Sequence, residues 1–392
     1  MVESDFTKAG LTLTIDGKYY NSLDIEGFSL MMKDPSYCYK FYWLEAIVQL
    51  ISEGIKETTF DAIIDEMICN AWYSVREFHI HLSGVQIDGK VRDGLERAVL
   101  LLTELSGLPA NASKVEIKNA IHEHNDALKN YKEQLTNMVP YRALAGFFHK
   151  SEESAVWGSV RRMTEYIERI NKNIVLLPYI LGEESKLKKK VYFQDDWVEM
   201  IQDQTVAILG WIQYEKVKWL QNNNPEVPGL IYKLAPMDEK MRKLNHVRKL
   251  WEGIIEISEI RDVFTDDVVV SNQYDVDHFI PWSFVMNDEL WNLMPMDSSL
   301  NSSKSNRLPK WNPFFKKFAR NQFIMYQMIH EKEGIRKLYE ACYRDNLHSL
   351  WAGQELYRRG NSEDEFMNIL QKNMQPVYDS AKRQGYELWN RG

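Results

Sequence analysis

The sequence has few cysteines, no long apolar run and no excess of positive charge, and each absence excludes a class of protein. Its three cysteines, Cys38, Cys69 and Cys342, lie far apart without a C-x-x-C spacing, which argues against a disulfide framework and against a zinc site built from cysteines. No apolar run reaches the roughly 18 residues of a membrane-spanning helix, and the first residues are acidic where a secretory signal would be basic. We therefore expect a cytoplasmic protein that does not enter a membrane.

The charge balance limits how the chain can meet a polyanion. Its 392 residues include 48 Lys and Arg against 56 Asp and Glu, which gives a formal net charge of −8. A protein with this net charge cannot surround nucleic acid with a positively charged surface, so any contact with nucleic acid must be confined to a local basic region. The hydrophobic fraction of 44% is enough to build sizeable cores, and the length favours two or three folded units.

Apolar residues recur at helical spacing over much of the first half of the chain. The helices expected from this spacing cover 41–55, 60–72, 154–170 and 196–220. Ser113 and Glu116 have the spacing of a capping box, and the helix that they open has few breakers before Pro140. Helical spacing returns after Pro313, so we predict an α+β fold that is predominantly α-helical.

The clearest break in the chain is the run Asn222-Asn223-Asn224-Pro225, which Pro228 and Gly229 follow. Proline and glycine interrupt helices, and asparagine favours turns. We place a domain boundary there. The prediction is a mostly helical amino-terminal domain at 1–228 for targeting, dimerisation or regulation, a central domain at 229–320 and a helical carboxy-terminal region at 321–392.

One short segment of the central domain combines residues that carry chemistry. Asp277 directly precedes His278 at the end of a strand-like run, and Pro281 then breaks that run. Neighbouring residues of a strand point to opposite faces, so the pair can serve one site only where the strand ends. A second apolar run at 291–296 leads into a polar helix start at 297–299, and the order is strand, loop, strand and helix.

This segment resembles the HNH endonucleases with their ββα-metal motif, and in particular the HNH domain of the CRISPR RNA-guided DNA endonucleases. Asn292 and Asn301 follow His278 by 14 and 23 residues, and Tyr274 to His278, Pro281, Ser283 and Phe284 add to the likeness. The match covers about Tyr274 to Lys304, and it implies that the central domain, 229–320, is an HNH nuclease domain with a ββα-metal core at about 268–307.

The resemblance also implies a role for each motif residue. His278 would be the general base that takes a proton from water, and Asp277 and Asn301 would be the metal ligands. A carboxylate and an amide oxygen with open positions favour Mg²⁺ or Mn²⁺ over zinc. Asn292 would brace the loop that presents the histidine rather than touch substrate.

Basic residues close to the motif are the expected contacts to nucleic acid. Lys304 lies three residues after Asn301, on the same helical face, so its ammonium group is expected near the scissile phosphate. Arg307 and Lys310 are further candidates. Other basic residues flank the motif on both sides: Lys240, Arg242, Lys243, Arg248, Lys249, Lys316, Lys317 and Arg320. The alternative for these flanks is the solvated face of a helix.

Other groupings point to structure rather than chemistry. His79 and His81 are spaced at i, i+2 without an evident third metal ligand, which favours a structural role. Trp43, Trp72 and Trp251 lie among apolar residues, as core tryptophans do.

The sequence thus predicts a metal-dependent HNH endonuclease that hydrolyses DNA, with a role in bacterial restriction or anti-phage defence. DNA is the expected substrate, and a homodimer or a protein of the same defence system is the expected partner. Two alternatives stay open: a nonenzymatic nucleic-acid or protein adaptor that reuses the fold, and a nuclease that cleaves RNA.

Overall fold

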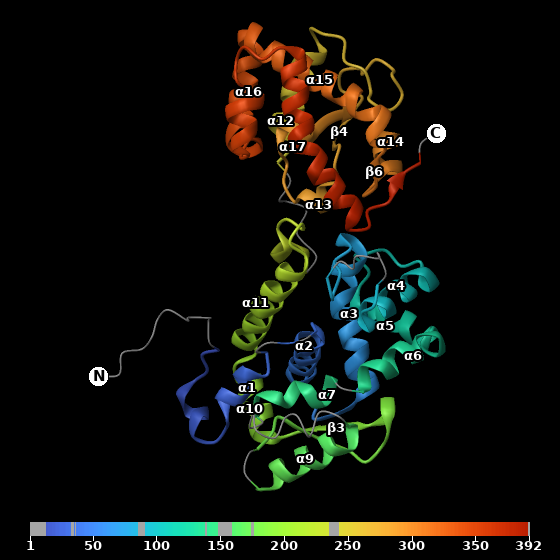
Figure 1. The fold of residues 1–392 in the computed structure, drawn as a ribbon, viewed down its shortest axis with the longest axis vertical. Coiled ribbons are helices and arrows are strands. Elements are labelled where there is room, and N and C mark those ends of the chain that lie inside the picture. The colour runs from blue at the N-terminus through green and yellow to red at the C-terminus, as the bar shows by residue number, and fades with distance from the viewer. Residues whose placement is uncertain are drawn as a thin grey trace, which may run out of the picture. The chain divides into compact units, whose positions relative to one another are not determined.

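The chain forms two compact units that divide after Asn224 (Figure 1). The computed structural model describes residues 13–32, 35, 37–84, 91–137, 139–147, 159–173, 176–234 and 243–390. As predicted, the fold is α+β and predominantly helical.

Unit 1, Met1–Asn224, is built mainly from α-helices. These are α1 (Ile25–Leu30), α2 (Tyr39–Ser52), α3 (Phe60–Phe78), α4 (Gly94–Ser106), α5 (Lys114–Glu123), α6 (Asn125–Thr136), α7 (Val139–Arg142), α9 (Val160–Asn173), α10 (Asp195–Asp203) and α11 (Thr205–Asn223). Short 3₁₀ helices cover η2 (Gly17–Asn21), η3 (Ala143–Phe147) and η4 (Lys186–Lys188). Helix α2 packs against α3, α10 and α11 and so lies at the centre of this unit.

A small antiparallel sheet completes unit 1, in the strand order β1 (Glu57–Thr59), β3 (Lys190–Phe193) and β2 (Tyr179–Leu181). Alternate residues of the central strand β3 are buried, as the period of a half-buried strand requires. Two tryptophans of this unit that the sequence placed inside are buried in its core: Trp43 and Trp72 are at most 1% exposed.

Two expected helices of unit 1 are each divided by one residue. His124 separates α5 from α6 with φ −105° and ψ 20°, and Gln204 separates α10 from α11 with φ −113° and ψ 17°. The capping box of Ser113 and Glu116 is present at the start of α5. The expected single helix from Ser113 to Pro140 is therefore wrong in extent, because Asn125 and Asp126, residues that favour helix starts, begin a new helix.

The described residues of unit 2, Pro225–Gly392, form two small sheets among longer helices. Its helices are α12 (Asn245–Ile255), α13 (Trp282–Val285), α14 (Ser298–Lys304), α15 (Trp311–Glu331), α16 (Glu333–Asn346) and α17 (Glu363–Arg383), with η5 (Leu230–Lys233) and η7 (Leu290–Asn292) as 3₁₀ turns and η8 (Ala352–Leu356) as a π-helix. The strands are β4 (Asp275–His278) paired antiparallel with β5 (Leu293–Met296), and β6 (Leu308–Pro309) paired parallel with β7 (Leu388–Trp389).

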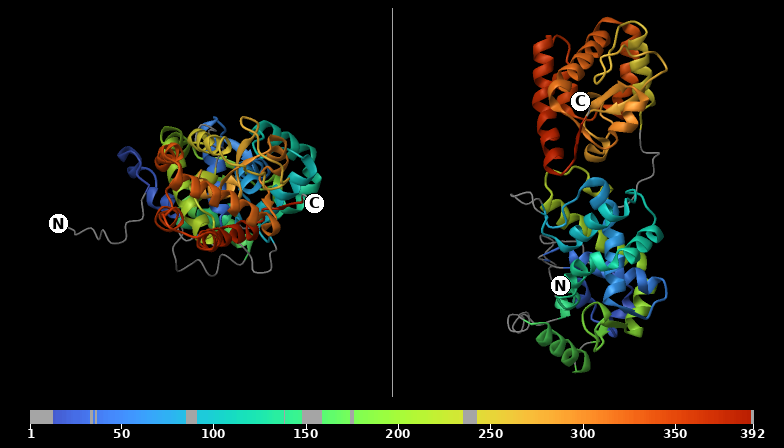
Figure 2. Two further views of the ribbon diagram at one scale, coloured as in Figure 1. Left: turned by 90° about the horizontal axis from the view of Figure 1, so that it is seen from above. Right: turned by 90° about the vertical axis from the view of Figure 1, so that its right-hand side faces the viewer.

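One hydrophobic core holds unit 2 together, and it draws on residues from Val247 to Trp389. Helices α12 and α15 pack on strand β5, and α16 and α17 pack on α15. Figure 2 gives two further views of the ribbon, in which the carboxy-terminal helices are orange to red. Helix α15 runs through residue 320, the end of the central domain expected from sequence. The ββα segment and the carboxy-terminal helices therefore share one core.

None of the helices that the structure describes is both long enough and apolar enough to span a membrane.

Candidate active site

The strands β4 and β5 and the helix α14 follow one another as strand, strand and helix. The strands pair in the register Asp275↔Met296, Asp277↔Met294 and His278↔Leu293. The Asp297 carboxylate caps α14 by accepting hydrogen bonds from the backbone N–H groups of Ser299 at 2.9 Å and Leu300 at 3.1 Å. This cap fixes the start of α14, and α14 packs on β4.

Two carboxylates of β4 meet two polar side chains of α14. Burial alternates along the strand, and Asp275 and Asp277 are the partly exposed residues. The Asp277 Oδ2 accepts a hydrogen bond from Lys304 Nζ at 2.8 Å, and the Asp275 Oδ2 accepts one from Asn301 Nδ2 at 3.3 Å. Because that bond uses the nitrogen of the Asn301 amide, it leaves Oδ1 as the oxygen available to a cation.

Lys304 is the most deeply buried charge of this group. Its side chain is 1% exposed, and Nζ also donates to the backbone carbonyl of His278 at 2.8 Å. The ammonium group therefore links α14 to the end of β4. In this arrangement it contacts the proposed metal ligand Asp277 directly.

His278 lies on the buried face of β4, and its ring is held by the loop that follows the strand. Nε2 lies 3.2 Å from the carbonyl oxygen of Asn287 and 3.1 Å from Oδ1 of Asp288. Both neighbours are hydrogen-bond acceptors, so we assign a ring proton to Nε2. Among the described residues, no hydrogen bond or ion pair joins the ring of His278 to Asp277 or Asn301.

Asn292 fastens the turn that follows β4. Its Nδ2 donates to the carbonyl of Ile280 and its Oδ1 accepts from the N–H of Ile280, each at 2.8 Å. The residue is fully buried. These are the two bonds that a residue bracing the histidine loop would need.

The structure adds two carboxylates that motif reasoning did not single out. Asp275 shares a strand face with Asp277, and its signal was available in the i, i+2 spacing of the sequence. Asp288 lies beside His278 only because the intervening loop folds back, and its Oδ2 also accepts from the backbone N–H of Lys243 at 2.7 Å. No local spacing signals that contact.

Several of the basic residues around the site have structural partners, Arg307 and Arg248 among them. Arg307 donates to the carbonyls of Ser303 and Lys304 at the end of α14. Arg248 of α12 donates to the carbonyl of Tyr274 at 2.9 Å and lies 3.9 Å from Asp275 Oδ1. Lys310 is half-buried at the start of α15. Lys240 and Arg242 lie outside the described residues.

Burial changes the acidity of several groups in unit 2, among them Lys233 and Tyr274. It lowers the pKa of Lys233 to about 7, and the ammonium group donates to the carbonyl of Phe284 at 2.5 Å. Burial, followed by a hydrogen bond with Glu252, raises the pKa of Tyr274 above its ordinary value.

The histidine pair of unit 1 is structural, as its spacing suggested. Burial lowers the pKa of His79 to about 4, with the charge of Arg76 as the next cause. His81 Nδ1 lies 2.8 Å from a carboxylate oxygen of the buried Glu96. The burial of the His79 ring and the contact of the His81 ring with Glu96 are both features of the folded unit 1.

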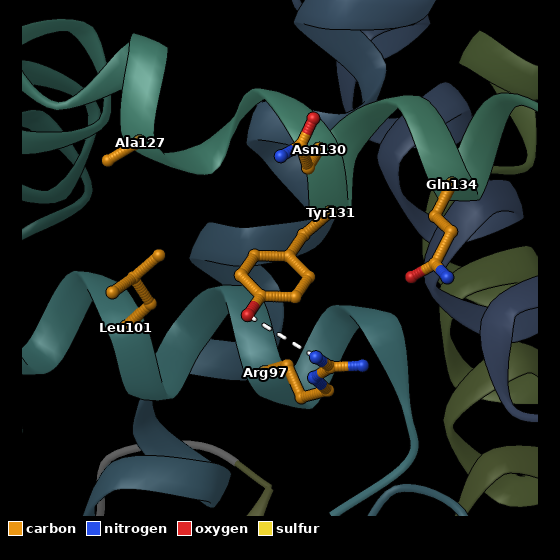
Figure 3. A pocket seen from close by; sticks show the side chains of 6 residues that line it. All are labelled: Arg97, Leu101, Ala127, Asn130, Tyr131 and Gln134. Atoms are coloured by element: carbon orange, nitrogen blue, oxygen red, sulfur yellow. Dashed lines mark hydrogen bonds between the residues drawn. The ribbon is translucent and has the colours of Figure 1, made fainter.

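A separate hollow lies in unit 1 between α4 and α6 (Figure 3). In it, Arg97 donates to the hydroxyl of Tyr131 at 3.4 Å and lies over its ring. Its lining residues are Arg97, Leu101, Ala127, Asn130, Tyr131 and Gln134. This set contains no carboxylate, histidine or cysteine, so the hollow offers neither a metal ligand nor a general base.

Comparison with known proteins assigns one segment. Residues 262–310 match the family model described as HNH endonuclease, and this range contains β4, β5, α14 and the motif residues. Neither the comparison with curated proteins nor the comparison with solved structures gave a match.

Proposed function

Because residues 262–310 are an HNH endonuclease segment, we propose that this chain is a metal-dependent nuclease that hydrolyses phosphodiester bonds of DNA. The observation that carries the proposal is the packing of α14 on β4. In this packing, Asp275 is hydrogen-bonded to Asn301, and Asp277 is hydrogen-bonded to Lys304. Oxygen donors and an imidazole carried by the same strand, with His278 at the end of β4, are the residue types that metal-assisted hydrolysis uses.

The donors at this place suit a hard divalent cation. Within the described part of the chain, no group of three His, Cys, Asp or Glu side chains is arranged to hold a metal ion. In this proposal a cation at β4 would be held by Asp277 and by Oδ1 of Asn301, with Asp275 on the same strand face and water in the other positions. Oxygen ligands and retained water are typical of Mg²⁺ or Mn²⁺ rather than of zinc.

Each residue of the site then has a task. When bound, the cation would neutralise charge on the phosphate and polarise the water that attacks it. His278 takes the proton of that water at Nδ1 while Asn287 and Asp288 hold its Nε2–H. Asn292 keeps the loop behind the ring in place through its two bonds to Ile280.

The same proposal covers binding and biology. Arg307 and Lys310 would contact the phosphates of DNA near the site, through the electrostatic attraction that dominates such binding. Lys304, the third residue expected to do so, would reach a phosphate only by leaving its bonds to Asp277 and to the carbonyl of His278. One ββα site cuts one strand, so a double-strand break needs a dimer or two successive nicks. We place the activity in the cytoplasm, in bacterial restriction or anti-phage defence, with a protein of the same system as a second candidate partner.

Cleavage of supercoiled plasmid in Mg²⁺ tests the function. The native chain should relax and linearise the plasmid, and His278→Ala should lower the rate by about 10² to 10⁴. A matched digestion of single-stranded RNA separates a DNase from an RNase.

An intact plasmid under both Mg²⁺ and Mn²⁺, together with retained DNA binding, would support the alternative of a nonenzymatic adaptor. Equal rates for the native chain and His278→Ala would reject His278 as the general base and leave nuclease activity in place.

A further inference from the structure

A lysine already occupies the carboxylate that the proposed cation would use. Lys304 Nζ lies 2.8 Å from Asp277 Oδ2, and the lysine side chain is 1% exposed. A second bond of 2.8 Å to the carbonyl of His278 holds the ammonium group on the end of β4. The nearest positive charge to Asp277 in this state is therefore one that the chain itself supplies.

Burial strengthens the electrostatic interaction of the Lys304 ammonium group with neighbouring charges. Charges exposed to solvent are screened over a Debye length of about 8–10 Å at moderate salt and interact through water of high dielectric constant, whereas buried charges are screened much less. Arg248 offers a contrast within the same site, because its guanidinium is 3.9 Å from Asp275 and its side chain is 48% exposed. The half-exposed Arg248 side chain meets water and has a hydrogen bond to the carbonyl of Tyr274, whereas Lys304 is held inside the protein by two bonds at the end of β4.

We propose that Lys304 is a positioning residue that competes with the divalent cation for Asp277 and so weakens cation binding. The inference rests on the proposed function, because it takes Asp277 as the metal ligand. With Lys304 in place, part of the negative charge of Asp277 is already neutralised, and the ammonium group repels the incoming ion. The device keeps the affinity low, so that the site loads most fully when the phosphates of a substrate add their own negative charge.

The direct test is the affinity of the full-length chain for Mn²⁺, measured by calorimetry without nucleic acid. Lys304→Met removes the charge and keeps most of the side-chain length, and it should bind Mn²⁺ at least about tenfold more tightly than the native chain. Lys304→Arg keeps the charge and should bind as weakly as the native chain. Lys317→Met is the matched control, because Lys317 pairs with Asp266 at 3.4 Å, away from the proposed ligands.

A second measurement on the native chain guards against a variant that does not fold. Lysines labelled with ¹³C at the ε-carbon give one NMR signal each, and the signal missing from Lys304→Arg identifies Lys304. Saturating Mg²⁺ should shift that signal and leave the signal of Lys317 in place. An unmoved Lys304 signal, or Lys304→Met binding Mn²⁺ no more tightly than the native chain, overturns the inference.

The variant Asp277→Ala separates this outcome from failure of the proposed function. If Asp277→Ala binds Mn²⁺ as well as the native chain does, then Asp277 is not a ligand and the proposed site itself is wrong. If Asp277→Ala loses Mn²⁺ binding and Lys304→Met binds Mn²⁺ no more tightly than the native chain, then Asp277 remains a ligand and only the proposed role of Lys304 is rejected.

Discussion

At the scale of single residues, Asn292 is a motif residue whose side chain is bonded to the backbone after β4. It is fully buried, and both of its side-chain bonds go to the backbone of Ile280, two residues after His278. Asn292→Ala would leave a buried N–H and a buried carbonyl without those partners. We expect a loss of about 2–3 kcal/mol in the free energy of unfolding, measured by urea denaturation. Asn301→Ala, at a partly exposed position, should cost clearly less, and an equal cost would contradict the bracing role of Asn292.

Asp65 provides a pH test in unit 1. Burial raises the pKa of its carboxyl to about 6, although Lys132 lies 2.6 Å away. A carboxyl with a raised pKa in the folded state stabilises the protein at low pH, and that contribution is lost as the pH rises from about 4 to about 6. Asp65→Asn has no such titration. Its stability relative to the native chain should therefore increase over this range, in urea unfolding at several pH values, and a decrease would contradict the assignment.

Motif residues were predictable from the sequence because their spacing is local. Asp277, His278 and Asn301 lie within one strand–loop–strand–helix run, and the likeness to a known family identified them. The partners of these side chains were not predictable in the same way. Asp288 reaches His278 only through the path of the loop after β4, and the burial of Lys304 depends on how α14 packs on that strand.

At the scale of elements, the end of α16 and the residues after it hold the loop between β4 and β5. Asn346 Nδ2 donates to the carbonyls of Asp288 at 2.8 Å and Lys243 at 2.9 Å. The carboxylate of Glu289 accepts from the N–H groups of His348 at 2.8 Å and Ser349 at 3.1 Å. The loop that positions His278 is thus fastened by residues outside the segment 262–310.

Asn346→Ala tests this connection. The variant loses two buried bonds and should unfold about 2 kcal/mol more easily in urea. Its plasmid cleavage should also slow, at protein concentrations and temperatures where it is still folded, because the loop behind His278 is released. Asn361→Ala is a matched control, since Asn361 also donates to two backbone carbonyls but those belong to Glu355 and Leu356. Equal loss of cleavage in both variants would point to general destabilisation.

Helix positions were predicted more reliably than helix limits. The apolar spacing found α2 and α3, and the capping box found the start of α5, because these signals lie within a few residues. The breaks at His124 and Gln204 interrupt continuous apolar patterns, so periodicity did not reveal them.

At the scale of the whole molecule, the single core of unit 2 determines which fragments of the chain can fold independently. The core joins α12, the β4–β5 pair and α15 to α17. A fragment of residues 225–392 should therefore give a folded circular dichroism spectrum and a cooperative thermal transition. A fragment that ends at residue 320 cuts α15 and removes α16 and α17, so it should not fold. A cooperative transition for the shorter fragment would contradict the single core.

The most direct measurement of the central claim is a crystal structure of the chain soaked in Mn²⁺, with anomalous scattering to locate the ion. The account predicts an anomalous peak at the face of β4 that α14 covers, with Asp277 and Asn301 as its protein ligands. Data to good resolution with no peak at that face, or with the ion bound only elsewhere, would contradict it.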